Sequence, residues 1–237
     1  KKKSRFLFFE FQYLIMSKTK VLIDFDSTFT KVEALDILGE ISLDGHPEKE
    51  ERLKEIADIT NLGMNGEISF ADSLIKRIEI LNGNTAQIEA LIVRLKTLVS
   101  ESTKRNIDFF KSYADNIYIV SSGFKEFIVP VVADFGISAD HVYANTFVSN
   151  EKGDIIDVDN NNPLSKDQGK VKLMEQLNFD GEIFVIGDGY TDYEIKGAGY
   201  ASKFFCFVEN VKRDKPLAKA DHVIGGFDEF LDITKLN

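Results

Sequence analysis

The sequence predicts a doubly wound, mostly parallel α/β sheet with an inserted helical cap domain. Three short apolar runs (Val21–Ile23, 116–120 and Ile183–Ile186) lead straight into polar residues, which is typical of strands buried on both faces of a parallel sheet. Segments with helical periodicity alternate with the later runs, as they do when helices join parallel strands. Between the first two runs, residues 31–105 carry apolar side chains at helical spacing without any strand-like run. This stretch therefore indicates an insertion made of helices.

The first apolar run ends at two aspartates, Asp24 and Asp26. Residues two apart on a strand point the same way, and open α/β sheets place their ligands where such strands end. Two carboxylates this close repel each other, and a divalent cation relieves that repulsion. Oxygen-only ligands favour Mg²⁺. Taken alone, the pair is equally compatible with a strand that ends in an acidic turn.

The insertion contains three groups of apolar residues at helical spacing, within residues 34–41, 74–81 and 88–98. Glycine, proline and asparagine interrupt the pattern at residues 44–47, 61–66 and 82–84, where we expect turns. We interpret the insertion as several helices that form a cap over the mouth of the sheet.

The α/β pattern resumes after the insertion. We predict strands at residues 116–120, 141–144, 183–186, 204–208 and 222–224, helices at residues 124–135 and 164–177, and a hairpin at residues 147–158. Gly136 is a plausible end for the first of these helices. The single cysteine, Cys206, lies in an apolar run and is expected in the core, and it cannot form an intrachain disulfide.

The composition limits both the domain organisation and the function. With 237 residues, the chain can form one large domain or a core with an insertion. Its 39 acidic and 29 basic residues give a net charge of −10, which argues against nucleic-acid binding because such proteins present a basic face. Residues 1–15 are basic and aromatic but too short to span a bilayer, and we interpret them as an extension, disordered or a start-site artefact. We assign residues 16–30 and 106–237 to the α/β core and residues 31–105 to the cap.

Two more predicted strands end in polar residues. Ser121-Ser122-Gly123 follows one, and Gly187-Asp188-Gly189 follows another. A serine followed by backbone N–H groups at a helix start can hold phosphate oxygens, although an ordinary N-cap has the same sequence. Because the carboxyl ends of parallel strands lie at one edge of the sheet, we expect Asp24, Ser121 and Asp188 to share one crevice.

These segments resemble the four motifs of the haloacid dehalogenase superfamily, and the form Asp24-Phe-Asp26-Ser-Thr with Glu33 is similar to its phosphoserine phosphatase branch. The resemblance implies a haloacid dehalogenase-like core in which Asp24 is a nucleophile, Asp26 a general acid and base, and Lys170 a third catalytic residue. Lys170 fits the helix register best in Lys166-Asp-Gln-Gly-Lys170, while Lys166 stays open as its rival. The resemblance implies that the Mg²⁺ ligands are Asp24, the main-chain carbonyl of Asp26, Asp188 and, in support, Asp192.

The same resemblance implies a set of substrate-binding residues. Glu33 would bind an ammonium group and Arg77 a carboxylate, for which a planar guanidinium is suited. The other implied contacts come from several segments: Met64, Phe70, Ser121, Ser122, Gly123, Lys170 and Thr191. Met64 and Phe70 are equally explained by core packing, and a surface charge would equally explain Arg77. Ser122 and Thr191 stand where many relatives carry glycine and asparagine.

The implied function is Mg²⁺-dependent hydrolysis of O-phospho-L-serine, the last step of serine biosynthesis, through an aspartyl-phosphate. Three alternatives stay open: hydrolysis of homoserine phosphate, phosphoethanolamine or a sugar phosphate, phosphotransfer to an alcohol, and a non-catalytic phosphoamino-acid sensor. The expected partner is a small phosphorylated metabolite, with no nucleic acid and no stable membrane insertion. We expect a cytoplasmic monomer or homodimer.

Overall fold

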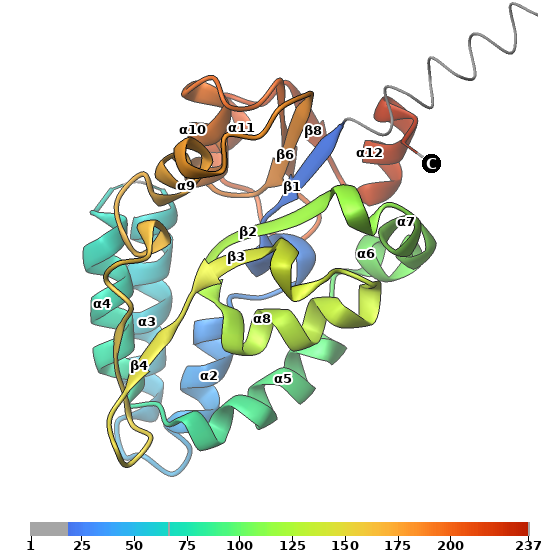
Figure 1. The fold of residues 1–237 in the computed structure, drawn as a ribbon. Coiled ribbons are helices and arrows are strands. Elements are labelled where there is room, and N and C mark those ends of the chain that lie inside the picture. The colour runs from blue at the N-terminus through green and yellow to red at the C-terminus, as the bar shows by residue number, and fades with distance from the viewer. Residues whose placement is uncertain (1–18, 66, 237) are drawn as a thin grey trace, which may run out of the picture.

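A six-stranded parallel sheet forms the centre of the computed structural model, which describes residues 19–65 and 67–236 (Figure 1). The predicted extension, residues 1–15, lies outside the described residues. The strands are β1 (Lys20–Ile23), β2 (Ile117–Phe124), β3 (Val142–Asn145), β6 (Ile183–Gly187), β7 (Lys203–Phe207) and β8 (His222–Ile224). Their order in the sheet is β3-β2-β1-β6-β7-β8. The chain first adds β2 and β3 on one side of β1, and then returns to add β6, β7 and β8 on the other side. This reversal confirms the doubly wound α/β prediction.

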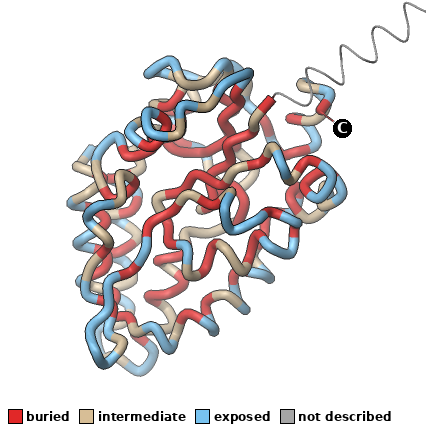
Figure 2. The backbone as a smooth tube through the Cα atoms, in the orientation of Figure 1, coloured by how far each residue is buried: buried red, intermediate tan, exposed pale blue. Residues whose placement is uncertain are grey.

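The two faces of the sheet contribute to separate hydrophobic clusters. In β1, Val21 and Ile23 belong to the larger cluster and Leu22 to the smaller one, as expected when successive side chains point to opposite faces. Helices α7 (Ile107–Ser112), α8 (Lys125–Val132) and α12 (Phe227–Thr234) supply side chains to the larger cluster, while α9 (Gly169–Leu177) and α10 (Tyr190–Gly197) supply the smaller one. Cys206 is buried in the smaller cluster, and Figure 2 shows buried backbone running through the sheet.

Four helices, α2 (Ala34–Ser42), α3 (Lys49–Met64), α4 (Phe70–Leu81) and α5 (Ile88–Thr97), form what we call the helical layer. The chain enters and leaves it through adjacent segments, because Thr30 and Val99 form an antiparallel bridge. The following helix, α6 (Glu101–Arg105), contacts α12 of the core. We propose that the helical layer acts as the cap.

An antiparallel hairpin supports one end of the helical layer. Strands β4 (Phe147–Ser149) and β5 (Ile155–Val158) pair with each other, and β5 packs on α4. The Ile155 amide donates to the Gly83 carbonyl at 2.8 Å, and the Thr85 amide donates to the Gly153 carbonyl at 2.8 Å. The hairpin therefore ties the end of α4 to the α/β core.

Two predicted helix boundaries were wrong. The turn expected from residue 61 begins later, because α3 continues to Met64; Gly63 lies against Ser73 of α4, and an added Cβ would be 2.7 Å from the Ser73 hydroxyl. The helix expected over residues 164–177 is split into a 3₁₀ turn, Pro163–Ser165, and α9. Gln168 has a left-handed φ of 55°, which a continuous helix does not allow.

The remaining elements are short connections. Helix α11 (Asp214–Leu217) precedes β8, and 3₁₀ turns occupy Thr85–Gln87, Ala114–Asn116, Ala133–Phe135 and Ala139–His141. Gly136 follows the third of these turns with a φ of +81°, so the predicted glycine stop is confirmed.

Candidate active site

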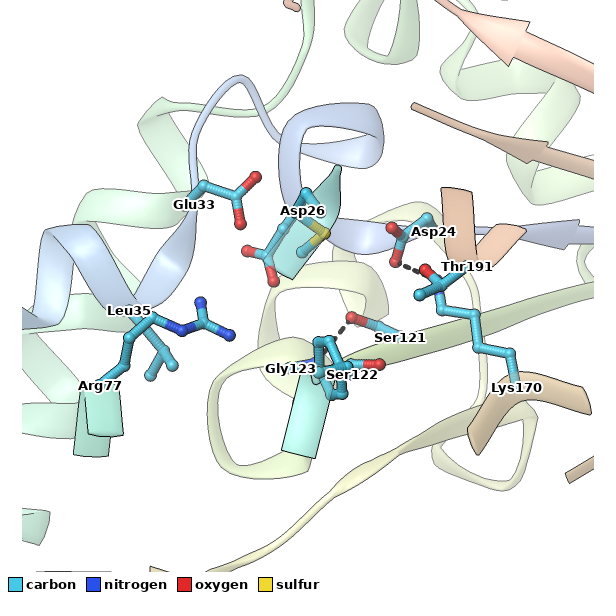
Figure 3. A pocket seen from close by; sticks show the side chains of 12 residues that line it. Asp24, Asp26, Glu33, Leu35, Arg77, Ser121, Ser122, Gly123, Lys170 and Thr191 are labelled. Carbon is cyan, nitrogen blue, oxygen red and sulfur yellow. Dashed lines mark hydrogen bonds and ion pairs between the residues drawn. The ribbon is translucent and has the colours of Figure 1, made fainter. Parts of the chain in front are cut away.

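The carboxyl ends of β1, β2 and β6 converge at the point where the strand order reverses, and the candidate site lies there (Figure 3). Asp24 follows β1, Ser121 lies in β2, and Asp188 follows β6. Asp24, Asp188 and Asp192 each offer one oxygen atom, and these atoms lie within 4.8 Å of one another. All three side chains are buried. Asp24 therefore belongs to two groups of residues: it forms an acidic cluster with Asp188 and Asp192, and it lines one pocket together with Ser121.

A tight turn, Phe25–Phe29, separates Asp24 from the helical layer. Ser27 adopts a left-handed φ of 55°, which is uncommon for a residue other than glycine. Its hydroxyl donates to Glu33 Oε1 at 2.7 Å. From a distant loop, the Asn210 amide donates to the carbonyl of Ser27 at 3.0 Å and to the Ser100 hydroxyl at 2.8 Å. These contacts fix the turn that carries Asp26.

Lys170 neutralises part of the acidic cluster. Its Nζ lies 3.0 Å from Asp24 Oδ1 and 2.6 Å from Asp192 Oδ1, and its side chain is buried. Burial disfavours the ammonium, but Asp192 and Asp24 raise the pKa of Lys170 above its usual value. Its rival Lys166 instead donates to Asn160 at 2.6 Å near the surface. Of the two lysines, Lys170 is therefore the one that contacts the acidic cluster.

Arg213, which the sequence motifs do not reveal, provides a second cation. Its Nε donates to Asp188 Oδ2 at 2.9 Å, while Thr28 donates to Asp188 Oδ1 at 3.1 Å. The guanidinium also reaches Asn61 of α3 at 3.2 Å and Glu33 at 3.5 Å. Arg213 thus connects the acidic cluster of the core with the helical layer.

The cluster still carries excess negative charge. Burial and the charges of Glu33 and Asp24 raise the pKa of Asp188 to about 7. Burial and Asp24 raise the pKa of Asp192 to about 8, although Lys170 opposes this. The raised pKa values mean that the ionised form of these carboxylates is disfavoured at this site. A bound divalent cation would favour the ionised form again. Three buried oxygen ligands therefore fit a hard divalent metal ion.

Asp26 lies in the turn that follows Asp24 and is not part of the acidic cluster. Its Oδ1 accepts a hydrogen bond from the Ala34 amide at 2.7 Å. Burial, followed by the charges of Glu33 and Asp24, raises the pKa of Asp26 well above the usual 3.8. A carboxyl group whose pKa is raised keeps its proton to a higher pH than an ordinary aspartate and can give and take a proton in a reaction.

Strand β2 brings its backbone close to these aspartates. An added Cβ at Gly123 would lie 3.1 Å from Asp26 Oδ2 and 3.2 Å from the Ser121 hydroxyl, so a side chain there would crowd both groups. The Gly123 amide donates to Ser121 Oγ at 2.9 Å. Ser121, Ser122 and Gly123 all line the pocket, where hydroxyl and amide groups can bind an anion.

Arg77 reaches the pocket from α4. Only 4% of the residue is exposed, and among residues 19–65 and 67–236 it forms no ion pair within 4.0 Å. Burial lowers the pKa of Arg77, and Glu33, Asp36 and Asp26 oppose that shift. Figure 3 shows the guanidinium pointing across the pocket towards Asp26. A surface charge, the alternative explanation of Arg77, does not fit this burial.

The space between atoms in the pocket, counted together with the solvent to which it opens, is about 380 Å³. The pocket brings together most of the predicted residues, and its lining also includes Leu35, which the sequence motifs do not reveal. The lining residues are Asp24, Asp26, Glu33, Leu35, Met64, Phe70, Arg77, Ser121, Ser122, Gly123, Lys170 and Thr191. Asp188 and Asp192 are not among them, and they meet the pocket through Asp24, with which they form the acidic cluster.

Comparison with known proteins identifies the family. The family model described as haloacid dehalogenase-like hydrolase matches residues 21–195. A phosphoserine phosphatase of Drosophila melanogaster is 30% identical over 223 residues, covering 92% of this chain and 78% of the relative. The chloroplastic phosphoserine phosphatase of Arabidopsis thaliana is 27% identical over 216 residues, covering 90% and 70%.

Solved structures agree with these relatives. A phosphoserine phosphohydrolase-like protein from Francisella tularensis has a TM-score of 0.82 at 32% identity, covering 91% of this chain and 99% of that one. A phospho-aspartyl intermediate analogue of phosphoserine phosphatase has a TM-score of 0.71 at 25% identity, covering 91% and 98%. From the matched residues and these likenesses, the chain belongs to the haloacid dehalogenase-like hydrolase family.

Proposed function

We propose that this protein is a Mg²⁺-dependent phosphatase that hydrolyses O-phospho-L-serine to L-serine and phosphate through a phosphorylated Asp24. The likeness to phosphoserine phosphatases over more than nine-tenths of the chain supports the reaction class. The choice of substrate rests on one structural observation: the buried guanidinium of Arg77 points into the pocket without an ion pair among the described residues.

A buried cation without a direct counter-ion favours an anionic ligand, because isolated buried charge is costly. Arg77 and Glu33 line the same pocket, so a molecule that carries both a carboxylate and an ammonium group can pair with both. The guanidinium is planar and matches a carboxylate through two parallel hydrogen bonds. With the phosphoryl group beside Asp24, these requirements describe a small phosphorylated amino acid.

In the proposed mechanism, Asp24 attacks phosphorus in line and forms a mixed anhydride. The Phe25 amide, at 2.7 Å, and Lys170 both contact Asp24 Oδ1, which orients the other oxygen, Oδ2, for the attack. Asp26 protonates the departing serine oxygen and then takes a proton from the water that hydrolyses the anhydride. This double role requires the raised pKa that burial gives to Asp26.

The phosphoryl oxygens need donors around them as charge develops. We propose that Ser121, the Gly123 amide and Lys170 supply these, and that Ser122 and Thr191 add contacts at the rim. When bound, Mg²⁺ supplies electrostatic neutralisation of the phosphoryl group. Asp24, Asp188 and the main-chain carbonyl of Asp26 would hold it, with Asp192 in support. Met64 and Phe70 of the helical layer would exclude bulk water.

Several wider expectations rest on the family resemblance. In residues 19–65 and 67–236, no helix combines the length and the hydrophobicity needed to cross a bilayer. We propose a cytoplasmic protein that acts as a monomer or homodimer in serine biosynthesis. Phosphoethanolamine and sugar phosphates lack a carboxylate for Arg77, so they are less suitable substrates. Three buried aspartates and a buried lysine favour catalysis over passive binding.

Arg77→Ala is expected to lower kcat/KM for phosphoserine strongly while sparing para-nitrophenyl phosphate, which has neither a carboxylate nor an ammonium group. Losing a charge-assisted partner in a closed site costs about 2–5 kcal/mol. Arg77→Lys should recover only part of the loss, because a lysine cannot reproduce the two parallel bonds. The measurement is the ratio of the two specificity constants in wild type and both variants.

Lys76→Ala is the matched control, since Lys76 is the exposed neighbour of Arg77 on α4 and should leave the ratio unchanged. An equal loss on both substrates in Arg77→Ala would contradict the amino-acid specificity and would assign Arg77 to folding or closure.

A further inference from the structure

One edge of the Arg77 guanidinium is held by groups inside the helical layer. Its NH1 donates to the Thr60 hydroxyl at 3.3 Å, and its Nε donates to the Ser73 carbonyl at 3.4 Å. These two bonds occupy two of the five N–H donors of an arginine. The rest of the guanidinium faces the pocket, as Figure 3 shows.

Thr60 lies on α3, facing Arg77 of α4 and Asp36 of α2. It is 2% exposed. Its hydroxyl has two acceptors in reach, the Ile56 carbonyl at 2.9 Å, one helical turn earlier, and Asp36 Oδ1 at 3.4 Å. Whichever of the two receives the single hydroxyl proton, the oxygen of Thr60 keeps its lone pairs to accept from Arg77.

Asp36 is the nearby carboxylate that could neutralise Arg77. Burial raises the pKa of Asp36, and Arg77 opposes that shift. The two side chains nevertheless form no ion pair within 4.0 Å among the described residues, and the Thr60 hydroxyl contacts both of them. A direct pair with Asp36 would satisfy the guanidinium internally and would weaken its attraction for a ligand carboxylate.

We propose that Thr60 is a positioning residue for substrate specificity: its hydroxyl separates Arg77 from Asp36 and aims the guanidinium into the pocket. This inference rests on the proposed function of Arg77 as the carboxylate receptor. Thr60 touches neither the substrate nor the reacting atoms and acts only through Arg77. Three helices of the helical layer thus contribute to the proposed carboxylate site. Asp36 lies on α2, the Thr60 hydroxyl on α3 and the Arg77 guanidinium on α4.

Thr60→Val tests this role, because valine keeps the shape of threonine and removes the hydroxyl. The ratio of kcat/KM for phosphoserine to that for para-nitrophenyl phosphate should fall about tenfold, the typical effect of one hydrogen bond to a charged group. The loss should appear mainly in KM for phosphoserine. Thr60→Ser restores the hydroxyl and should return the ratio to within about twofold of wild type.

Thr103→Val is the matched control. Thr103 is also buried, but it lies on α6 and its hydroxyl has no hydrogen-bond partner among the described residues. The same substitution there should leave the ratio unchanged. Circular dichroism and thermal unfolding confirm that each variant is folded before its kinetics are compared.

A double-mutant cycle with Arg77→Ala separates positioning from an independent effect. If Thr60 acts through Arg77, adding Thr60→Val to Arg77→Ala should not lower the ratio further. Losses that multiply would overturn the inference, as would an unchanged ratio in Thr60→Val alone. Both of those results leave the proposed function intact if Arg77→Ala still lowers the ratio. An unchanged ratio in Arg77→Ala instead removes the proposed substrate, and this inference with it.

Discussion

Asp24→Asn is expected to reduce phosphate release to background while leaving the protein folded. An asparagine amide has nearly the same shape as the carboxylate but is not a usable nucleophile, so no acyl-phosphate can form. Removing one charge from a cluster with Asp188 and Asp192 also reduces repulsion. Lys170 keeps its bond to Asp192. The thermal unfolding midpoint without metal should therefore not fall.

The measurement combines phosphate release with trapping of the phosphoenzyme or its beryllofluoride analogue, located by mass spectrometry or crystallography. The wild type should be modified at Asp24 and the variant not at all. Asp108→Asn is the control, because Asp108 is exposed on α7 and should keep full activity. Modification of another residue would refute Asp24 as the nucleophile.

Asp26→Asn should slow turnover of phosphoserine by about 100- to 10,000-fold, the usual contribution of general acid–base catalysis. The asparagine oxygen can still accept from the Ala34 amide, so the turn should keep its shape. Both half-reactions should be slower, because the same carboxyl group gives a proton in the first and takes one in the second. Rapid-quench measurements of phosphoenzyme formation and decay resolve the two steps.

The pH profile gives a second readout for Asp26. Its pKa is raised, and the proton must be present when the serine oxygen departs. In wild type, kcat/KM should therefore decrease as the pH rises through the raised pKa. Asp26→Asn should lose that decrease, since an amide does not titrate there. Turnover equal to wild type would remove Asp26 from the mechanism.

The fold was predictable because its signals are local. Buried parallel strands appear as short apolar runs, so β1, β2 and β6 were recognised with their polar ends. Helix boundaries failed where tertiary contacts determine them. Gly63 resembles a helix break in the sequence but allows α3 to approach Ser73. The left-handed Gln168 is the N-cap of α9 and interrupts a helix that the apolar pattern would start earlier.

The same division applies to the site. Asp24 and Asp188 directly follow predicted strands, and the carboxyl ends of parallel strands lie at one edge of the sheet. The sequence therefore indicates that these two aspartates lie at that edge. Arg213 comes from the loop after β7 and meets Asp188 and Glu33 only through the fold. Thr60 has no charge and sits in an ordinary helical pattern on α3, so only its contact with Arg77 reveals a role. Residues that act through long-range contacts carry no signature in one sequence.

We expect this chain to release phosphate from phosphoserine with the help of a divalent metal. The most direct measurement is kcat/KM for phosphate release from a panel containing phosphoserine, phosphoethanolamine, homoserine phosphate and sugar phosphates, with Mg²⁺ and with EDTA. Phosphoserine should have the highest value, and EDTA should abolish turnover of every substrate. A sugar phosphate or phosphoethanolamine with the highest value, or full activity in EDTA, would contradict the proposed function.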